Sequence, residues 1–156
     1  MHPYRTHTCG ELRPSHVGEG VRLSGWIHRK RDHGGLLLVD LRDNYGLSQC
    51  VIETTSPIFP LAEDTRTESV ITITGKVVAR SEDTVNQELP TGDVEVQIEA
   101  FSVQSAANML PLQVKSEMDY PEETRLKYRF LDLRLEKMHA NKLLRTGIIS
   151  SVRRRM

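Results

Sequence analysis

The sequence lacks the marks of several common protein classes. It holds only two cysteines, Cys9 and Cys50, which are far apart and outside any C-x-x-C spacing. Neither a zinc site nor a disulfide framework is therefore indicated, and both thiols are expected to stay reduced. Aromatic residues amount to 5%, and no apolar run approaches the roughly 20 residues that a membrane-spanning helix needs. We expect a soluble, cytoplasmic protein with no membrane partner.

A net charge is also absent, because 21 Lys and Arg residues balance 21 Asp and Glu residues. This balance excludes a protein that coats nucleic acid through a uniformly basic surface. The charges are nevertheless unevenly distributed: residues 1–31 carry six basic and two acidic side chains, residues 32–124 carry five and 17, and residues 125–156 carry ten and two. A polyanionic partner would have to be bound by a local patch.

Alternation of apolar and polar residues predicts β-structure over the first two thirds of the chain. In residues 21–27 the apolar positions Val21, Leu23 and Ile27 lie on one face and alternate with Arg22, Ser24 and Trp26. Later segments repeat the pattern. Residues 58–68 lose the alternation and predict one short helix, with Pro60 in its first turn or outside it. The predicted strands cover residues 21–27, 36–43, 47–53, 69–80 and 94–103.

Five short strands with one helix between the third and the fourth match a mainly β fold, the five-stranded Greek-key barrel called the OB-fold. A β-sandwich is the competing architecture, but it usually has about seven strands. With 38% hydrophobic residues the chain can fill one core of this kind. Strand faces of such barrels commonly bind oligonucleotides, but related barrels bind sugars or proteins, so the fold leaves the ligand open.

The remainder of the chain differs in kind. Residues 105–124 are irregular and contain Pro111 and Pro121, which predicts a hinge between two modules. Residues 125–156 are helical in composition. The hinge and the helices therefore form a separate part of the molecule.

Two helices are expected in this last part. In the first, apolar residues at spacings of four and three predict one apolar face. The second covers residues 141–156, and its pattern runs to Met156 without a C-terminal cap, so we expect it to open a domain that continues beyond the chain. The predicted faces consist of Leu126, Phe130 and Leu133 in the first helix and of Leu144, Ile148 and Val152 in the second.

Residues 26–35, with the sequence WIHRKRDHGG, concentrate cations just ahead of a flexible Gly-Gly. Arg29, Lys30 and Arg31 at the end of the first strand could neutralise phosphates and offer donors to base acceptors. A solvated strand end is the alternative interpretation. His28 and His33 in the same stretch have no partners at a metal-ligand spacing, so no metal site is expected.

Longer motifs carry a family resemblance from Cys9 to the last residue. GWIHRKRDHGG, DLRDNYG, ITITGKVVAR, TGDVEV, LPLQV and YRFLDLR follow one another in fixed order. This series resembles the start of bacterial-type aspartyl-tRNA synthetases, a class IIb family. The resemblance implies an OB-fold anticodon-binding domain over 1–104, a hinge over 105–124, and the truncated start of a class II catalytic domain over 125–156.

For the whole enzyme the resemblance implies an aspartate–tRNA ligase. Such an enzyme forms aspartyl-adenylate from aspartate and ATP with the help of Mg²⁺, and then transfers aspartate to the 3′ end of tRNA(Asp). The helix over 141–156 would begin motif 1, a dimer-interface helix, which implies a homodimer. Motifs 2 and 3, which hold ATP and the amino acid, would lie beyond Met156, so no catalytic residue and no cofactor are expected in this chain.

The resemblance also implies a set of tRNA anticodon-binding residues. Arg31 and Gln49 correspond to residues that contact the anticodon, with the Gln49 amide matched to the central uridine. Glu95 corresponds to a carboxylate that accepts hydrogen bonds from a guanine at the first anticodon position. Arg29 and Arg80 belong to the same set. From the residues alone, exposed sheet surface is the alternative interpretation of Gln49 and Glu95.

Two further members of this set depart from a common pattern. Leu38 stands where many relatives have a Phe that stacks on a base, so the stacking free energy of roughly 1 to 3 kcal/mol per base is expected to be reduced. His33 stands where strict enzymes of the family typically have Leu, and His is typical of enzymes that charge both tRNA(Asp) and tRNA(Asn). We therefore expect dual tRNA specificity.

Three hypotheses of function remain. The first is the tRNA-selecting domain of an aspartate–tRNA ligase. The second is a related class IIb ligase for asparagine or lysine, which the amino-acid pocket downstream would distinguish. The third is a non-enzymatic module that binds single-stranded nucleic acid, which the basic helical extension disfavours.

Overall fold

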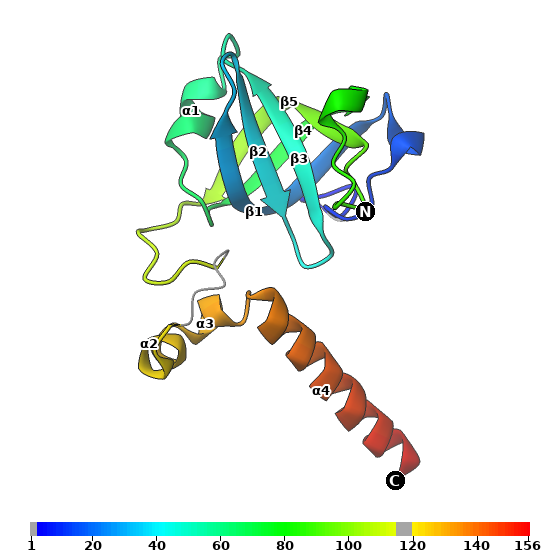
Figure 1. Ribbon diagram of the computed structural model, residues 1–156, viewed down its shortest axis with the longest axis vertical. Coiled ribbons are helices and arrows are strands. Elements are labelled where there is room, and N and C mark those ends of the chain that lie inside the picture. Colours follow the sequence, from blue (N-terminus) through cyan, green and yellow to red (C-terminus); the bar gives the residue numbers. More distant parts are fainter. Residues whose placement is uncertain (1–2, 115–119) are drawn as a thin grey trace. The chain divides into compact units, whose positions relative to one another are not determined.

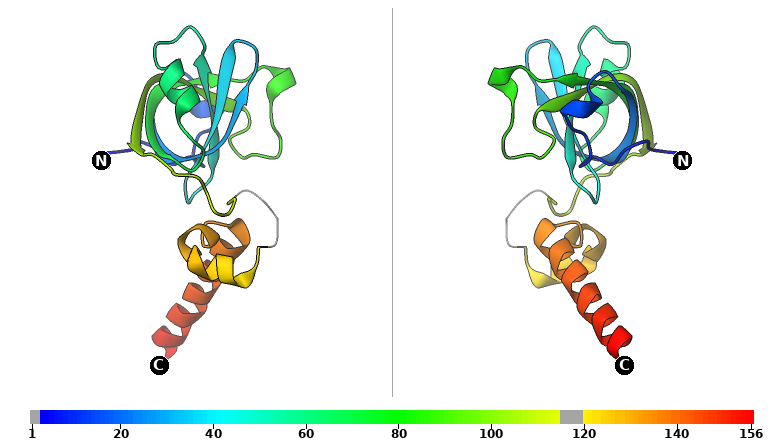
Figure 2. Two further views of the ribbon diagram at one scale, coloured as in Figure 1. Left: turned by 90° about the vertical axis from the view of Figure 1, so that its left-hand side faces the viewer. Right: turned by 90° about the vertical axis from the view of Figure 1, so that its right-hand side faces the viewer.

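Five β-strands close into a barrel in the order β1-β2-β3-β5-β4 (Figure 1). The structure is a computed structural model, and it describes residues 3–114 and 120–156. Neighbouring strands are antiparallel except for the parallel pair of β3 and β5, and Figure 2 shows the strands curling round to close the barrel. The strands are β1 (Gly20–Asp32), β2 (Leu36–Arg42), β3 (Leu47–Glu53), β4 (Val70–Ala79) and β5 (Val94–Ser105).

A short helix, α1 (Phe59–Asp64), lies between β3 and β4 in the chain, as the sequence predicted. Pro60 occupies its first turn, where a missing N–H group leaves no helical hydrogen bond unmade. Two 3-10 turns flank the strands, η1 (Pro14–His16) before β1 and η2 (Glu82–Thr84) between β4 and β5. Strand number, strand order and helix position confirm the expected OB-fold.

Side chains that alternate along the strands fill the interior of the barrel. Val21, Leu23 and Ile27 of β1 are at most 1% exposed, because alternate side chains of a strand point to the same face. Both cysteines are buried in this core and carry free thiols. The core also contains Leu12, Leu37, Val39, Leu41, Ile52, Ala62, Ile71, Ile73, Val77, Val94, Val96, Ile98 and Phe101.

β1 is longer than the sequence predicted, and the extension carries the basic residues. The strand continues from residue 27 to Asp32, and Arg31 pairs with Leu38 of β2. The register shifts between Ile27 and Arg29. Such a shift interrupts the alternation by which the strand was recognised in the sequence, which explains why the prediction ended too early.

A tight turn joins β1 to β2. Gly34 and Gly35 adopt φ angles of +52° and +125°, a region that side chains with a Cβ atom rarely enter. His33 donates its backbone N–H to the carbonyl oxygen of Leu36 across this turn. The Gly-Gly pair is therefore required by the backbone conformation of the hairpin.

The contacts of the chain divide it into two units, Met1–Asn108 and Met109–Met156. The helices of the second unit are α2 (Glu122–Lys127), α3 (Arg129–Asp132) and α4 (Glu136–Arg155). The single first helix that the sequence predicted is wrong, because the chain leaves helical geometry at Tyr128. Arg125 and Arg129, both partly exposed, pair with the fully buried carboxylate of Asp132 just after this break.

The apolar face predicted for the first helix is also wrong. Leu126 and Phe130 are 60% and 61% exposed, whereas Leu131 is buried against Leu112 and Val114. α4 begins at Glu136, five residues earlier than predicted, and the predicted face of Leu144, Ile148 and Val152 is exposed in this chain. Across the described parts of the chain, no helix combines the length and the apolar character that crossing a bilayer requires.

Candidate nucleic-acid interface

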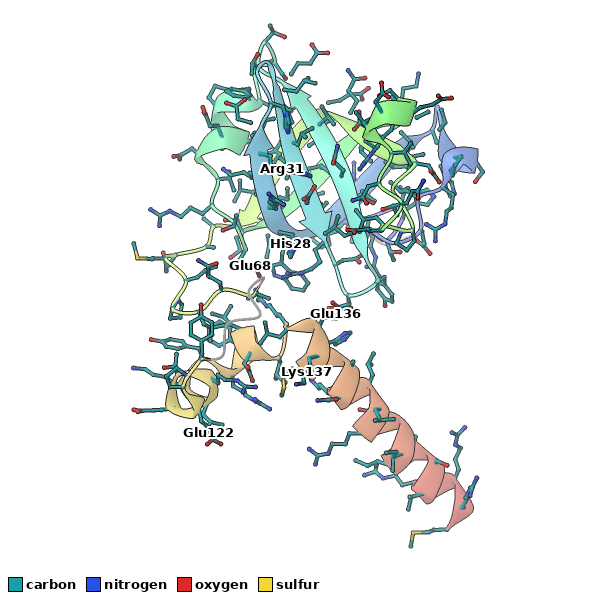
Figure 3. The ribbon with its side chains drawn as sticks, in the orientation of Figure 1. His28, Arg31, Glu68, Glu122, Glu136 and Lys137 are labelled. Carbon is teal, nitrogen blue, oxygen red and sulfur yellow. The ribbon has the colours of Figure 1, made fainter. Side chains whose placement is uncertain are left out.

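Five polar side chains from neighbouring strands meet on the outer face of the barrel. Strand alternation places Arg31 of β1, Asp40 of β2, Gln49 of β3 and Glu95 of β5 on this face, and Arg80 joins them from the position after the end of β4. We call these five residues the polar row. Figure 3 marks Arg31 on the outer face of the β1–β2 hairpin.

Arg31 is anchored through one nitrogen of its guanidinium group. Its Nη2 donates to both carboxylate oxygens of Asp40, at 2.9 and 3.2 Å, and to Oε1 of Gln49 at 3.2 Å. The Nε atom of Arg31 is buried and has no hydrogen-bond partner among the residues that the structure describes. One third of the Arg31 side chain remains exposed, so the group is fixed at one end and accessible at the other.

Gln49 occupies the middle of the polar row. Its Oε1 accepts from Arg31, and its Nε2 donates to Oε2 of Glu95 at 3.0 Å. Arg31 can only donate and an ionised Glu95 can only accept. The two partners therefore fix which end of the Gln49 amide faces β1 and which end faces β5.

Arg80 closes the polar row beside Glu95. Its Nε lies 3.8 Å from Oε2 of Glu95 and donates to the carbonyl oxygen of Val94 at 3.2 Å, while Nη1 donates to the carbonyl oxygen of Thr84 at 3.3 Å. The Arg80 side chain is 3% exposed, and its Nη2 is buried with no hydrogen-bond partner in the described part of the chain. Burial lowers the pKa of the Arg80 guanidinium, and the charges of Glu95 and Asp40 act in the opposite direction.

The polar row is electrically balanced. It contains two guanidinium groups and two carboxylates, so their formal charges cancel. The basic stretch seen in the sequence therefore does not make the centre of this face cationic. An unpaired phosphate would gain little there, whereas a base edge with donors and acceptors would find partners of both kinds.

An apolar strip lies next to the polar row on the same face. Leu38 lies on β2 two residues before Asp40, is half-buried, and pairs in register with Val51 of β3. Val51 lies two residues after Gln49 and is 7% exposed. Apolar side chains beside polar groups provide a surface on which the flat face of a base can pack.

The other predicted residues lie around this centre. Arg29 is exposed and pairs through its backbone with Asp40, so it lies on β1 two residues from Arg31. His33 is exposed in the β1–β2 turn. The structure therefore brings Arg31, Gln49, Glu95 and Arg80 into one network and places Leu38 and Arg29 beside it, with His33 in the adjoining turn.

Lys30 takes a different direction from its two neighbours. Its Nζ donates to the carbonyl oxygens of Ala62 and Glu63, at 3.2 and 2.5 Å, and so binds the C-terminal end of α1. Burial lowers the pKa of the Lys30 ammonium, although the nearby Glu63 and Asp64 act in the opposite direction. Lys30 therefore serves the packing of α1, in contrast to the interpretation of the whole basic run as phosphate ligands.

The polar row lies on the sheet face, outside two hollows of the molecule. A hollow of about 580 Å³ in the second unit is lined by residues that include Tyr120, Arg125 and Arg129, and another of about 210 Å³ is lined by residues that include Trp26 and Asp43. Neither hollow includes a member of the polar row. An open sheet face suits an extended ligand such as a single-stranded nucleic acid better than a small enclosed molecule.

One group of side chains in the described residues has the spacing of metal ligands. His7, His16 and Glu19 offer ligand atoms that lie within 4.8 Å of one another. However, Nδ1 of His16 accepts a hydrogen bond from the backbone N–H of Arg13 at 3.0 Å. A neutral His16 in this arrangement carries its proton on Nε2. In that form the second nitrogen has no lone pair for a metal, so the hydrogen bond from Arg13 disfavours metal binding by this group.

Asp40 is the member of the polar row that the sequence interpretation missed. The residue is 8% exposed and lies in a strand that is otherwise mainly apolar. A carboxylate in such a strand is costly to bury unless a cation or a donor pairs with it. An acidic residue within the run LLLVDLR was therefore a usable signal, although it did not reveal which cation would be the partner.

Comparisons with known proteins relate the barrel to a nucleic-acid-binding family. A family model described as "OB-fold nucleic acid binding domain" matches residues 21–105, which include the whole polar row. A protein from Methylorubrum populi named aspartate–tRNA(Asp/Asn) ligase is 63% identical over 156 residues, which make up 100% of this chain and 26% of that protein. A protein of the same name from Paramagnetospirillum magneticum is 56% identical, again over 100% of this chain but over 18% of its own length.

A solved structure shares both the barrel and the helical extension. The crystal structure of asparaginyl-tRNA synthetase from Pyrococcus horikoshii complexed with asparaginyl-adenylate matches with a TM-score of 0.79 and 26% sequence identity. The match covers 95% of this chain and 33% of that one. The chain thus spans about a fifth to a quarter of the length of the two curated relatives above.

Proposed function

The chain belongs to the OB-fold nucleic acid binding domain family, and from this membership we propose that it binds the anticodon loop of tRNA(Asp). The binding surface is the outer barrel face with the polar row and the apolar strip of Leu38 and Val51. The observation that carries the proposal is the oriented Gln49 amide, which is held by Arg31 on one side and Glu95 on the other. The named relatives agree with the family resemblance inferred from the sequence.

The remaining hydrogen-bonding capacity of the polar row matches an anticodon. After its bonds to Arg31 and Glu95, the Gln49 amide keeps one N–H donor and one lone pair. These suit the neighbouring donor and acceptor of a uridine edge. Glu95 has further lone pairs, which suit the N–H groups of a guanine. Exposed Arg29 is the residue that we assign to a backbone phosphate, because Arg31 is paired with Asp40.

For the whole protein we propose an aspartate–tRNA ligase. Its reaction would join aspartate to tRNA through aspartyl-adenylate, and the ATP and Mg²⁺ that this needs would bind outside these 156 residues. The chain covers only 18% and 26% of the length of these two relatives, which supports the placement of the ATP site outside it. We further propose that the whole enzyme is a cytoplasmic homodimer, with residues 125–156 at the start of its catalytic domain and 105–124 as the hinge.

We propose dual specificity for tRNA(Asp) and tRNA(Asn). The two anticodons differ only at the third nucleotide, and His33 in the β1–β2 turn is the residue that we assign to this position. The names of the relatives from Methylorubrum populi and Paramagnetospirillum magneticum include both tRNAs, which supports the assignment.

The test is direct binding of the chain to three anticodon stem-loops with the sequences GUC, GUU and UUU, at two salt concentrations. We expect similar affinity for GUC and GUU and much weaker binding of UUU. The salt dependence should be shallow, because each phosphate neutralised in a single strand contributes about 0.7 to the slope of log K against log salt and the polar row is balanced. Equal weak binding of all three would reduce the domain to a general polyanion binder.

The likeness to an asparaginyl-tRNA synthetase supports a second candidate, an asparagine-specific ligase. The same three stem-loops separate the two functions. A strong preference for GUU over GUC would favour the asparagine enzyme, whereas a strong preference for GUC would retain the aspartate enzyme and refute dual specificity.

A further inference from the structure

We propose that Asp40 is the positioning residue of this interface: it holds Arg31 so that Gln49 presents a fixed edge to the central anticodon base. The inference rests on the proposed function and adds a specificity determinant to it. Asp40 itself is not assigned a contact with RNA, because its side chain is only 12% exposed.

Asp40 is firmly held by the sheet. It lies on β2, and its backbone pairs with Arg29 of β1 on one side and with Gln49 of β3 on the other. A short carboxylate side chain on a doubly paired strand has little freedom to move. By contrast, the Arg31 side chain is long and has several rotatable bonds, so it needs an anchor to hold one geometry.

The anchoring geometry uses both hydrogens of Arg31 Nη2. One is shared between the two oxygens of Asp40, at 2.9 and 3.2 Å, and the other remains for Oε1 of Gln49 at 3.2 Å. Asp40 thus decides where the guanidinium stands, and the guanidinium decides where the amide oxygen of Gln49 points. The carboxylate acts on the base-reading residue through one intermediate.

The charge balance explains why Asp40 matters for Gln49. With Asp40 present, two guanidinium groups face two carboxylates. Without it, Arg31 and Arg80 would face Glu95 as their remaining acid within the polar row. Arg31 would then gain by moving towards Glu95, and this movement would compete with the hydrogen bond that Gln49 donates to Glu95. The amide would lose its fixed orientation.

The decisive experiment compares the chain with its Asp40→Asn variant. Affinities are measured for GUC and GCC stem-loops at one salt concentration, because uridine and cytidine differ in the donor and acceptor that the Gln49 edge reads. We expect the wild-type preference for GUC to fall at least about fivefold in the variant, the lower end of what a paired amide contact contributes. We also expect the side-chain amide resonance of Gln49 in the free protein to shift or broaden.

Glu68→Gln is the matched control. Glu68 accepts hydrogen bonds from Nη2 of Arg42 at 2.8 and 3.0 Å, and its side chain is 5% exposed. Glu68 lies outside the polar row, below Arg31 in Figure 3, and its backbone N–H donates to the carbonyl oxygen of Ile27 in the middle of β1. This variant removes the charge of a comparably buried ion pair, so it should lower stability without changing the ratio of GUC to GCC affinity.

Each outcome decides one question. If the wild-type chain binds neither stem-loop, the proposed function fails and the inference fails with it. If the wild-type chain prefers GUC and a folded Asp40→Asn variant keeps both that preference and the Gln49 resonance, Asp40 is not the positioning residue although the function stands. If Asp40→Asn does not fold, Asp40→Glu decides. It keeps the charge but moves the carboxylate, so an unchanged preference would overturn the inference.

Discussion

Lys30 donates a hydrogen bond of 2.5 Å to the backbone carbonyl oxygen of Glu63 and thereby joins β1 to the end of α1. Its flanking residues in the basic run behave differently, since Arg29 is exposed and Arg31 enters the polar row. Three consecutive cations that look equivalent in the sequence thus have three separate roles. The direction of each side chain follows from the strand, which sends neighbours to opposite faces.

Replacing Lys30 by Met should destabilise the barrel and leave RNA selection unchanged. The substitution keeps most of the aliphatic stem but removes the donors to the two α1 carbonyl groups, so we expect a loss of about 1 to 2 kcal/mol in the free energy of unfolding. Urea denaturation measures this loss. The control is Lys76→Met, which replaces an exposed lysine of β4. A Lys30→Met variant with unchanged stability but weaker stem-loop affinity would show that Lys30 contacts RNA.

The two core cysteines predict a loss of stability in alkali. Burial raises the pKa of both Cys9 and Cys50 above the ordinary value of 9.0. Above that value the thiols of the unfolded chain ionise while those of the folded chain stay protonated, so the folded state binds more protons and stability falls as pH rises. The slope approaches about 1.4 kcal/mol per pH unit for each thiol, and at lower pH there is no effect.

Denaturation at pH 8, 9 and 10 tests this effect, with the Cys9→Ala/Cys50→Ala variant as reference. The variant should lack most of the alkaline fall. Lys30 contributes with the opposite sign, because its lowered pKa lets stability rise as pH approaches 10.5, but this contribution is common to both proteins. Equal slopes for the two proteins would contradict the assignment to the thiols.

Leu38→Phe should strengthen binding of the anticodon loop. Leu38 is half-buried beside Val51 on the interface, so an aromatic ring at this position would lie where a base can stack. We expect a gain of about 1 kcal/mol, the low end of the range for base stacking, measured by titration of the GUC stem-loop. An unchanged affinity would show that bases do not pack on this strip.

His33→Leu should restrict binding from both tRNA(Asp) and tRNA(Asn) to tRNA(Asp). His33 is exposed in the hairpin turn, so the substitution should leave stability within about 0.5 kcal/mol of the wild type. The ratio of GUC to GUU affinity should rise by about tenfold, since one nucleotide contact contributes on the order of 1 to 3 kcal/mol. A ratio that stays at the wild-type value would locate the discrimination elsewhere.

Much of the fold followed from period-two patterning. The five strands, the helix between the third and the fourth, and the inward-facing residues such as Leu23 and Ile73 were all predictable, because alternation reports which face of a strand is buried. The extension of β1 to Asp32 was not predicted, since the register shift after Ile27 breaks the alternation. The interrupted helix before α4 was also missed, because the composition of residues 125–138 gives no sign of the non-helical backbone at Tyr128.

The candidate site was likewise predictable only in part. The sequence by itself determined the residue types, the order of the motifs and the faces on which Gln49 and Glu95 would lie. Only the tertiary structure decided that Arg31 forms an ion pair with Asp40, that Lys30 donates to the end of α1, and that the charges of the polar row cancel. The reason is physical: periodicity records local burial, whereas the pairing of charged groups depends on which strands closure of the barrel brings together.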